Sequence, residues 1–157
     1  MPYVNVVGRS AIGIKKWAYA CAAGWMLEEL VGKRLADRLE VTVHLIPGLK
    51  RDEKIKGDCT WEDDNVRPRE FTVRIDSERS EREQFTILAH ELVHVKQYAR
   101  MELYDTVKPD VVRWKRRRYK FSDNATVKQY KKYPWEREAY KLEAELYEKW
   151  IKKDSNK

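Results

Sequence analysis

Hydrophobic positions follow a helical interval in three segments of the chain. The first is 14–39, where apolar residues lie four or seven positions apart and charged residues fill the other face. The second is about 81–100, where Ser80 and Glu83 form a capping box at the expected start. The third is about 134–151, which begins with a proline suited to a first helical turn. We therefore expect an N-terminal helix and two later helices, each with one face turned to the core.

Other segments alternate apolar and polar residues, as strands do. Glu40–Ile46 is rich in β-branched residues and is followed by a Pro-Gly turn. Residues 69–76 alternate strictly, which predicts a strand with one buried face at or near a sheet edge. A shorter strand is expected around 59–61. Together these elements predict the α+β class, with a small, mostly antiparallel sheet in one domain that spans 1–157.

Residues 102–133 show neither helical spacing nor strand alternation of apolar residues. We expect an irregular segment here, which is long for a simple connection. Ten lysines and arginines but only two aspartates fall within 107–133, so this part carries a charge of +8 while the remaining 130 residues sum to −1. Any anionic partner should therefore be sought at this segment. The run from Trp114 to Tyr119 places aromatic residues beside cations, as in sites for single-stranded nucleic acid. A solvated basic loop has the same composition.

The composition excludes several classes of protein. With 42% hydrophobic and 38% charged residues, the chain reads as globular rather than disordered or fibrous. The longest uncharged stretch near the N-terminus, residues 17–27, is far shorter than the roughly 20 apolar residues of a membrane-spanning helix. No secretory signal is recognisable. Two cysteines, Cys21 and Cys59, are too few for a disulfide scaffold. These observations favour a cytoplasmic protein without a membrane partner.

The candidate chemistry lies in the helix expected at 81–100, which contains the motif H-E-x-x-H at residues 90–94. Residues four apart lie on one helix face, so His90 and His94 can bind the same metal ion. Glu91 points slightly to the side, where it can act on a water molecule at the metal. An apolar stripe on the opposite face would pack against the core: Phe85, Leu88, Ala89 and Leu92.

Catalytic zinc is held by three protein ligands and keeps one position open, so a third ligand must come from elsewhere in the chain. The remaining histidine, His44, falls in a predicted strand, where a hydrogen-bonded or half-exposed histidine is the ordinary finding. The last helix offers Glu136, Glu138 and Glu143 along the edges of its apolar stripe. A carboxylate there is also the normal edge of an amphipathic helix. The helical interval does not choose among the three glutamates.

The residues around the motif resemble the active helix of zincin metallopeptidases. The segment at 134–139, Pro-Trp-Glu-Arg-Glu-Ala, is similar to the P-W-E-x-E-A segment of small metallopeptidases common in bacteriophage genomes, which look like minimal gluzincins. In that family a glutamate on a second helix is the third zinc ligand, and the glutamate directly before the alanine corresponds to Glu138. The chain lacks the Asn-Glu-x-x-Ser/Asp motif of larger gluzincins. It also has no third histidine at the metzincin spacing after His94.

The resemblance implies a zincin-like fold and a zinc-dependent peptidase that acts on a peptide or protein substrate. His90, His94 and Glu138 would hold Zn²⁺, and Glu91 would be the general base. The strand at 69–76 would line the cleft and pair with an extended peptide. Four tyrosines are open candidates for stabilising the oxyanion: Tyr119, Tyr130, Tyr133 and Tyr140. A phage origin would place the protein in the host cytoplasm or in the virion.

Two alternatives to a simple peptidase follow from the same residues. If the basic segment 107–133 binds nucleic acid, the protein would be a nucleic-acid-associated protease or a DNA-binding protein. Alternatively, zinc would only stabilise a non-catalytic phage structural protein, whose metal site would be closed by a fourth protein ligand. No cysteine lies near the motif in the sequence to close such a site, which favours the enzyme. The oligomeric state is open.

Overall fold

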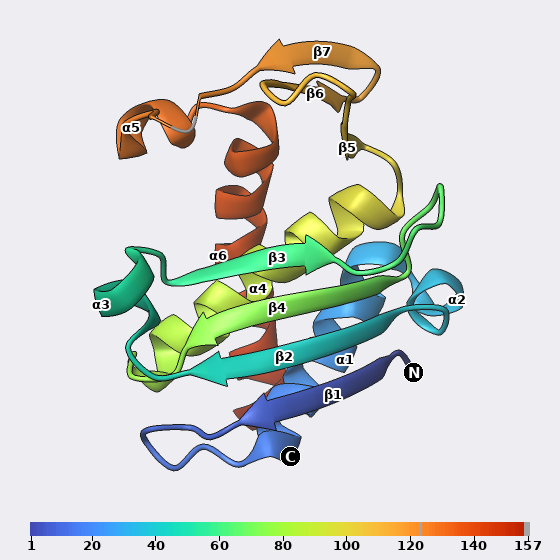
Figure 1. Ribbon diagram of the computed structural model, residues 1–157. Helices are drawn as coiled ribbons and strands as arrows, with labels where there is room; N and C mark the ends of the chain where they lie inside the picture. The colour runs from blue at the N-terminus through green and yellow to red at the C-terminus, as the bar shows by residue number, and fades with distance from the viewer. Residues whose placement is uncertain (123, 156–157) are drawn as a thin grey trace.

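The computed structural model describes residues 1–122 and 124–155, and a mixed four-stranded sheet forms its framework (Figure 1). The strand order is β1 (Tyr3–Gly8), β2 (Glu40–Ile46), β4 (Glu70–Asp76) and β3 (Gly57–Trp61). β1 pairs with β2, and β2 with β4, in parallel orientation. β3 runs antiparallel to β4 and forms one edge of the sheet. Two of the three pairings in this sheet are therefore parallel.

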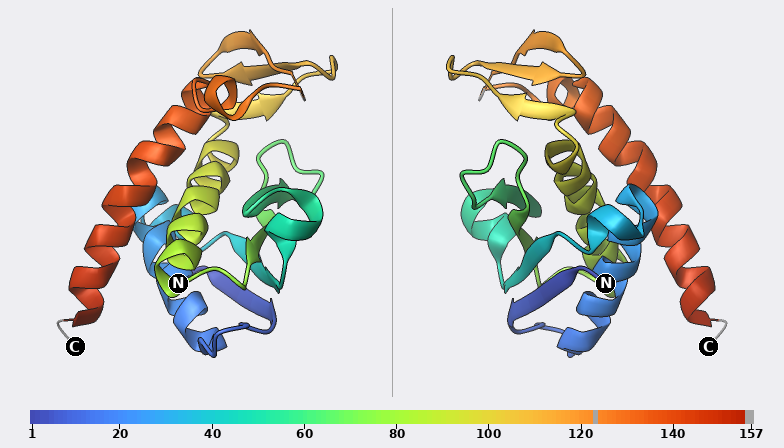
Figure 2. Two further views of the ribbon diagram at one scale, coloured as in Figure 1. Left: turned by 90° about the vertical axis from the view of Figure 1, so that its left-hand side faces the viewer. Right: turned by 90° about the vertical axis from the view of Figure 1, so that its right-hand side faces the viewer.

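Helices cover one face of this sheet. α1 (Lys16–Val31) and α4 (Glu81–Ala99) lie against it, and α6 (Pro134–Ser155) packs across α4 on the side away from the sheet (Figure 2). The short helices α2 (Lys33–Ala36) and α3 (Leu49–Glu53) lie in connections at opposite ends of the sheet. The predicted α+β class is confirmed, as a single domain.

Alternation in the strands explains how the main core forms. The apolar positions of β2 and β4 point to the helices and are almost fully buried, while their neighbours face outward. These core residues are Val41, Val43, Leu45, Phe71, Val73 and Ile75. The predicted apolar stripe of α4 meets them, because Phe85, Leu88, Ala89 and Leu92 are all buried in the same cluster. The helix that carries the motif is thus fixed on the sheet by one whole face.

The segment expected to be irregular is instead a small second sheet with a helical turn. β5 (Leu103–Asp105), β6 (Val111–Trp114) and β7 (Arg117–Lys120) form an antiparallel meander, followed by α5 (Val127–Tyr130). A separate apolar cluster around Trp135 holds this sheet against the start of α6. Strands of three or four residues are too short to show a clear alternation, which is why the sequence did not predict them.

Three further expectations about the fold are corrected. The expected helix at 14–39 ends at Val31, because Gly32 adopts a φ of 80° before α2 begins. β1 lies in a stretch for which no element was predicted. The expectation of a mostly antiparallel sheet holds for the second sheet and not for the main one. The strand at 69–76 does lie near a sheet edge, as expected: β4 is paired on both sides, and its neighbour β3 forms the edge beside α4.

The last helix extends to Ser155, four residues beyond its predicted end. None of the helices in the described ranges has the apolar length that a bilayer crossing requires.

Candidate metal centre

The predicted cap of α4 is present and fixes where the motif helix begins. The Ser80 hydroxyl oxygen accepts a hydrogen bond from the backbone N–H of Glu83 at 3.2 Å. The helix then runs without interruption to Ala99, with its apolar face on the sheet. This arrangement brings His90 and His94 into contact with Glu136 of α6.

A carboxylate of α6 lies between the two imidazoles. The Nε2 atom of His90 is 3.2 Å from Oε2 of Glu136, and Nε2 of His94 is 3.0 Å from Oε1 of the same residue. The two Nε2 atoms are 3.3 Å apart. One donor atom from each residue lies within 4.8 Å of the others, so the three side chains could hold a metal ion. We call His90, His94 and Glu136 the donor group. Glu136 itself is only 1% exposed.

The donor atoms lie close enough together for one metal ion, and zinc gives a standard for comparison. A tetrahedral zinc site has ligand distances of about 2.0–2.1 Å, which puts neighbouring ligand atoms roughly 3.3 Å apart. The two Nε2 atoms, 3.3 Å apart, match this value, and each of them lies 3.0–3.2 Å from a different oxygen of Glu136. Two imidazoles and a carboxylate are also ligand types that zinc accepts. Among the residues that the structure describes, no fourth histidine, cysteine, aspartate or glutamate joins the group.

Hydrogen bonds on the far side of each imidazole prepare the Nε2 atoms for a metal. Nδ1 of His90 lies 3.0 Å from Oε2 of Glu143, and Nδ1 of His94 lies 2.8 Å from Oε1 of Gln97. Each Nδ1–H can donate to its oxygen acceptor, so that loss of the proton on Nε2 would present that lone pair to a metal. Glu143, one of the three candidate ligands, therefore lies behind His90 and not at the metal position.

Glu138, the third ligand implied by the resemblance, lies elsewhere. Its Oε1 accepts hydrogen bonds from Lys96 Nζ at 2.7 Å and from Gln97 Nε2 at 3.2 Å. Residues two positions apart in a helix are about 200° apart around its axis, so Glu136 and Glu138 face different sides of α6. The packing of α6 on α4 brings Glu136 to the histidines. The third member of the donor group is therefore Glu136, and the expectation of Glu138 is corrected.

Glu138 still contacts the site indirectly, through Gln97. The amide nitrogen of Gln97 donates to the backbone oxygen of Trp135 at 2.9 Å and to Glu138, so its amide oxygen is left facing His94. The sequence did not single out Gln97, although its place three residues after His94 puts it within reach on the same helix. His44, the remaining candidate, is exposed on β2 and takes no part in the donor group.

The buried charges of the group shift one another's pKa values. Burial alone would lower the pKa of His90, but hydrogen bonds to Glu136 and Glu143 raise it to about 10. Burial opposes ionisation of Glu136, yet the hydrogen bonds with His90 and His94 hold the pKa of this carboxyl well below its usual range. The Glu136 carboxylate is therefore ionised at neutral pH, as a metal ligand must be.

Glu91 lies in a different environment from Glu136. It is buried, and desolvation raises the pKa of its carboxyl although the two histidines act in the opposite direction. Its side chain lines a cleft of about 910 Å³, together with His90, Gly57, Ile87, Tyr130 and Tyr140. A carboxylate with a raised pKa at the wall of a cleft is suited to accept and return a proton.

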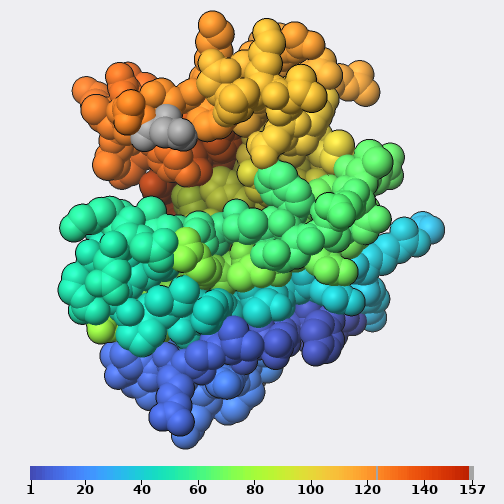
Figure 3. Space-filling model, in the orientation of Figure 1, coloured from blue at the N-terminus to red at the C-terminus, as the bar shows by residue number. Residues whose placement is uncertain are grey.

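The cleft lies between the start of β3, with the turn before it, and the segment 121–133 that follows the second sheet, and α4 and α6 are visible at its floor in Figure 3. Gly57, the first residue of β3, allows the close approach of this edge strand to α4. A Cβ atom at this position would lie 2.6 Å from Cγ2 of Ile87 and 2.7 Å from the backbone oxygen of Arg74. Any larger residue would therefore push β3 away from the helix that carries the motif.

The structure distinguishes the four tyrosines that the sequence left open. The hydroxyl of Tyr130 donates to Oε1 of Glu136 at 2.7 Å, which places it beside the donor group. The ring of Tyr140 lies edge-on to His90, 4.7 Å between centroids. Tyr133 stacks on Trp135, and its hydroxyl accepts a hydrogen bond from the backbone of Ser122. Tyr119 packs against the same tryptophan.

The aromatic residues of the basic segment have a structural role. Trp114 is 7% exposed and packs with Trp135 at 6.5 Å between ring centroids. It is therefore part of the cluster that holds the second sheet to α6, and it offers no free face for a nucleic-acid base. The cations Arg116, Arg117, Arg118 and Lys120 are exposed on that sheet.

Gln97 provides a test of the hydrogen bonds behind the histidines. Gln97→Leu is expected to weaken zinc binding by about 10- to 100-fold, because His94 loses the acceptor that orients it. Competition with a zinc-binding dye measures this change. Gln84→Leu is the matched control, since Gln84 is another fully buried glutamine of α4 but bonds to Tyr19, Ser77 and Arg79. It should lower the free energy of unfolding without changing zinc affinity; an equal loss of affinity in both variants would contradict the assigned role.

Comparisons with family models, curated proteins and solved structures give no match to this chain. The site is therefore interpreted from its own geometry.

Proposed function

We propose that this chain is a zinc-dependent metallopeptidase of the minimal gluzincin type, with His90, His94 and Glu136 as the zinc ligands. The observation that carries the proposal is the convergence of these three donors near Glu91, which lines the cleft together with His90. Three protein donors leave a position open, which is the arrangement of a catalytic rather than a structural zinc site. For this reason we prefer an enzyme to a zinc-stabilised structural protein.

When bound, zinc would polarise the scissile carbonyl group and lower the pKa of a water molecule toward neutrality. Glu91 is the general base in this proposal. Its carboxylate would take a proton from the attacking water and then deliver it to the nitrogen of the leaving amine. Its burial supports this role, because a raised pKa makes the carboxylate a stronger proton acceptor.

Two other features of the cleft support peptide hydrolysis. β3 is an edge strand, so the backbone groups on its side away from β4 can pair with an extended peptide, the role first expected for the strand at 69–76. The hydroxyl of Tyr130 lies at the donor group and can donate a hydrogen bond to the oxygen of the scissile carbonyl as negative charge develops there.

The experiment that tests the proposal is digestion of a mixed peptide library by the zinc-loaded protein, with products identified by mass spectrometry. We expect new peptide termini to appear, to disappear after treatment with a chelator, and to return when zinc but not magnesium is added. Cleavage that proceeds equally in the chelated protein would contradict zinc-dependent hydrolysis. Failure to cleave any member of a diverse library with zinc bound would contradict a peptidase.

A further inference from the structure

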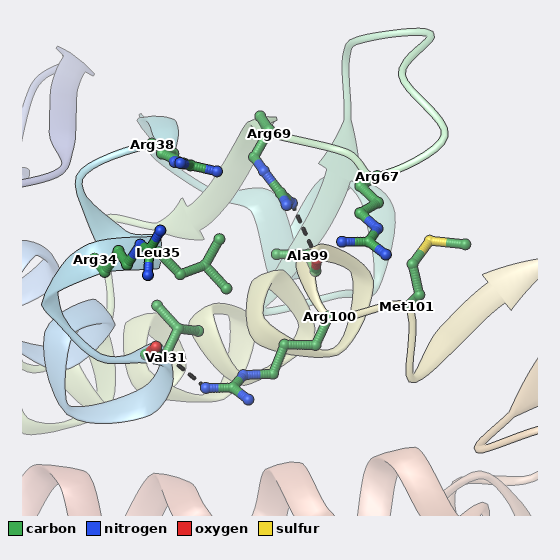
Figure 4. A pocket seen from close by; sticks show the side chains of 9 residues that line it. All are labelled: Val31, Arg34, Leu35, Arg38, Arg67, Arg69, Ala99, Arg100 and Met101. Carbon is green, nitrogen blue, oxygen red and sulfur yellow. Dashed lines mark hydrogen bonds between the residues drawn. The ribbon is translucent and has the colours of Figure 1, made fainter.

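A second hollow, distinct from the cleft, lies at the other end of α4. Its volume is about 580 Å³, and it shares no lining residue with the cleft. Its walls come from the end of α1, from α2, from the connection between β3 and β4, and from the end of α4 (Figure 4). Five of its nine lining residues are arginines, and none is acidic: Arg34, Arg38, Arg67, Arg69 and Arg100.

Two of these arginines have a structural partner. Nη1 of Arg69 donates to the backbone oxygens of Pro68 at 2.8 Å and Ala99 at 3.0 Å, and Nη2 of Arg100 donates to Val31 at 3.1 Å. Ala99 and Val31 are the last residues of α4 and α1, where carbonyl groups lack helical partners. A carbonyl oxygen has only a partial negative charge, so these bonds balance only part of each guanidinium charge. The Asp63 carboxylate acts on the pKa of Arg69 in the opposite direction from the neighbouring arginines.

The other three arginines have no structural partner. Arg34, Arg38 and Arg67 are exposed, and within residues 1–122 and 124–155 their side chains form no hydrogen bond or ion pair. Two of these charges act on Arg69. Burial lowers the pKa of Arg69, and the nearby charges of Arg67 and Arg38 lower it further. Like charges gathered around one hollow repel one another, and a bound anion would relieve that repulsion.

We propose that this hollow binds a small ligand that carries two or more neighbouring phosphate groups. A phosphate monoester has a charge of about −1.5 to −2 at neutral pH, so two adjacent phosphates balance most of the arginine charge, whereas a single carboxylate balances one arginine. Planar guanidinium groups also bind phosphate oxygens in pairs. The volume lies within the range of small-molecule sites, about 300–1,000 Å³.

The lining favours a small ligand over a nucleic-acid strand. Apolar side chains, among them Leu35 and Met101, form part of the wall and can contact the organic part of a phosphorylated molecule. No aromatic residue lines the hollow, whereas proteins that bind single strands stack bases on aromatic side chains. The proposal does not depend on the metal centre, because the two sites share no residue.

The test is calorimetric titration of the full chain with sodium pyrophosphate in low-salt buffer. The wild type is compared with the double variant Arg34→Gln/Arg38→Gln, which changes exposed side chains without a structural partner. Arg116→Gln/Arg117→Gln is the matched control, since it removes the same charge from exposed positions of the second sheet. We expect binding that weakens by about tenfold or more in the first variant and stays within about twofold in the control.

Each result decides the proposal. Loss of binding in Arg34→Gln/Arg38→Gln, with unchanged far-ultraviolet circular dichroism, supports it, and the same loss in the single variant Arg67→Gln would strengthen it. Pyrophosphate held only by zinc would bind the Arg34→Gln/Arg38→Gln variant as tightly as the wild type, and this result would overturn the proposal. Absence of pyrophosphate binding to the wild type, including the case in which a single-stranded oligonucleotide binds instead, would overturn it as well.

Discussion

Replacing Glu91 with glutamine is expected to lower the rate of peptide hydrolysis by about 10²- to 10⁴-fold, the usual contribution of a general acid–base group. Glutamine has nearly the same size and shape, so it fits the buried position of Glu91, but its amide cannot accept the proton of the attacking water. Glu91 is absent from the donor group, and the variant should therefore bind one zinc ion per chain. The measurements are kcat for a peptide selected from the library and the zinc content of the same sample.

Glu81→Gln is the control for this experiment. Glu81 is an exposed glutamate in the first turn of α4, and its replacement changes the net charge by the same amount. It should leave both hydrolysis and zinc content unchanged. Full activity of Glu91→Gln would refute the proposed mechanism, while loss of zinc from this variant would mean that Glu91 contributes to metal binding.

Glu136→Ala and Glu138→Ala are expected to differ sharply in zinc binding. Removing a direct ligand should weaken zinc by more than the 10- to 100-fold loss typical of residues behind a ligand, whereas Glu138→Ala should retain one zinc ion after gentle dialysis. The two glutamates lie two residues apart on α6, so each variant serves as the control for the other. Atomic emission spectrometry of the dialysed proteins measures the zinc content.

Glu138→Ala can also reveal the contact through Gln97. Its loss frees one hydrogen bond of the Gln97 amide, while the bond to Trp135 remains. We therefore expect a modest weakening of zinc affinity in competition experiments, without loss of stoichiometry. Zinc that is lost from Glu138→Ala but kept by Glu136→Ala would restore the assignment made from the sequence.

Elements with a regular pattern and a clear end were predictable from the sequence. β2 coincides with the predicted range, and α4 ends within one residue of it, because each combines a regular apolar spacing with a turn or cap. His90, His94 and Glu91 followed from spacing along this one helix. The short strands of the second sheet were missed since their few positions are interrupted by basic residues.

The choice between Glu136 and Glu138 depended on information that no local pattern holds. Both lie in the first turns of α6, and both end in a carboxylate that can reach α4. The two glutamates differ in the side chains they contact on α4. Glu138 binds Lys96, two residues after His94, whereas Glu136 contacts the histidines. The register of α6 against α4 determines this pairing, and it arises only when the two helices pack.

The connection between α4 and α6 has an evolutionary consequence. The donor group rests on direct packing of these helices. The intervening residues 102–133 are attached through the cluster around Trp135, and those from Phe121 to Tyr133 form a roof over the cleft. Insertions or exchanges within the roof can therefore reshape the cleft while the three donors keep their positions. Selection can therefore change the shape of the cleft at one set of positions and preserve the donor group at another.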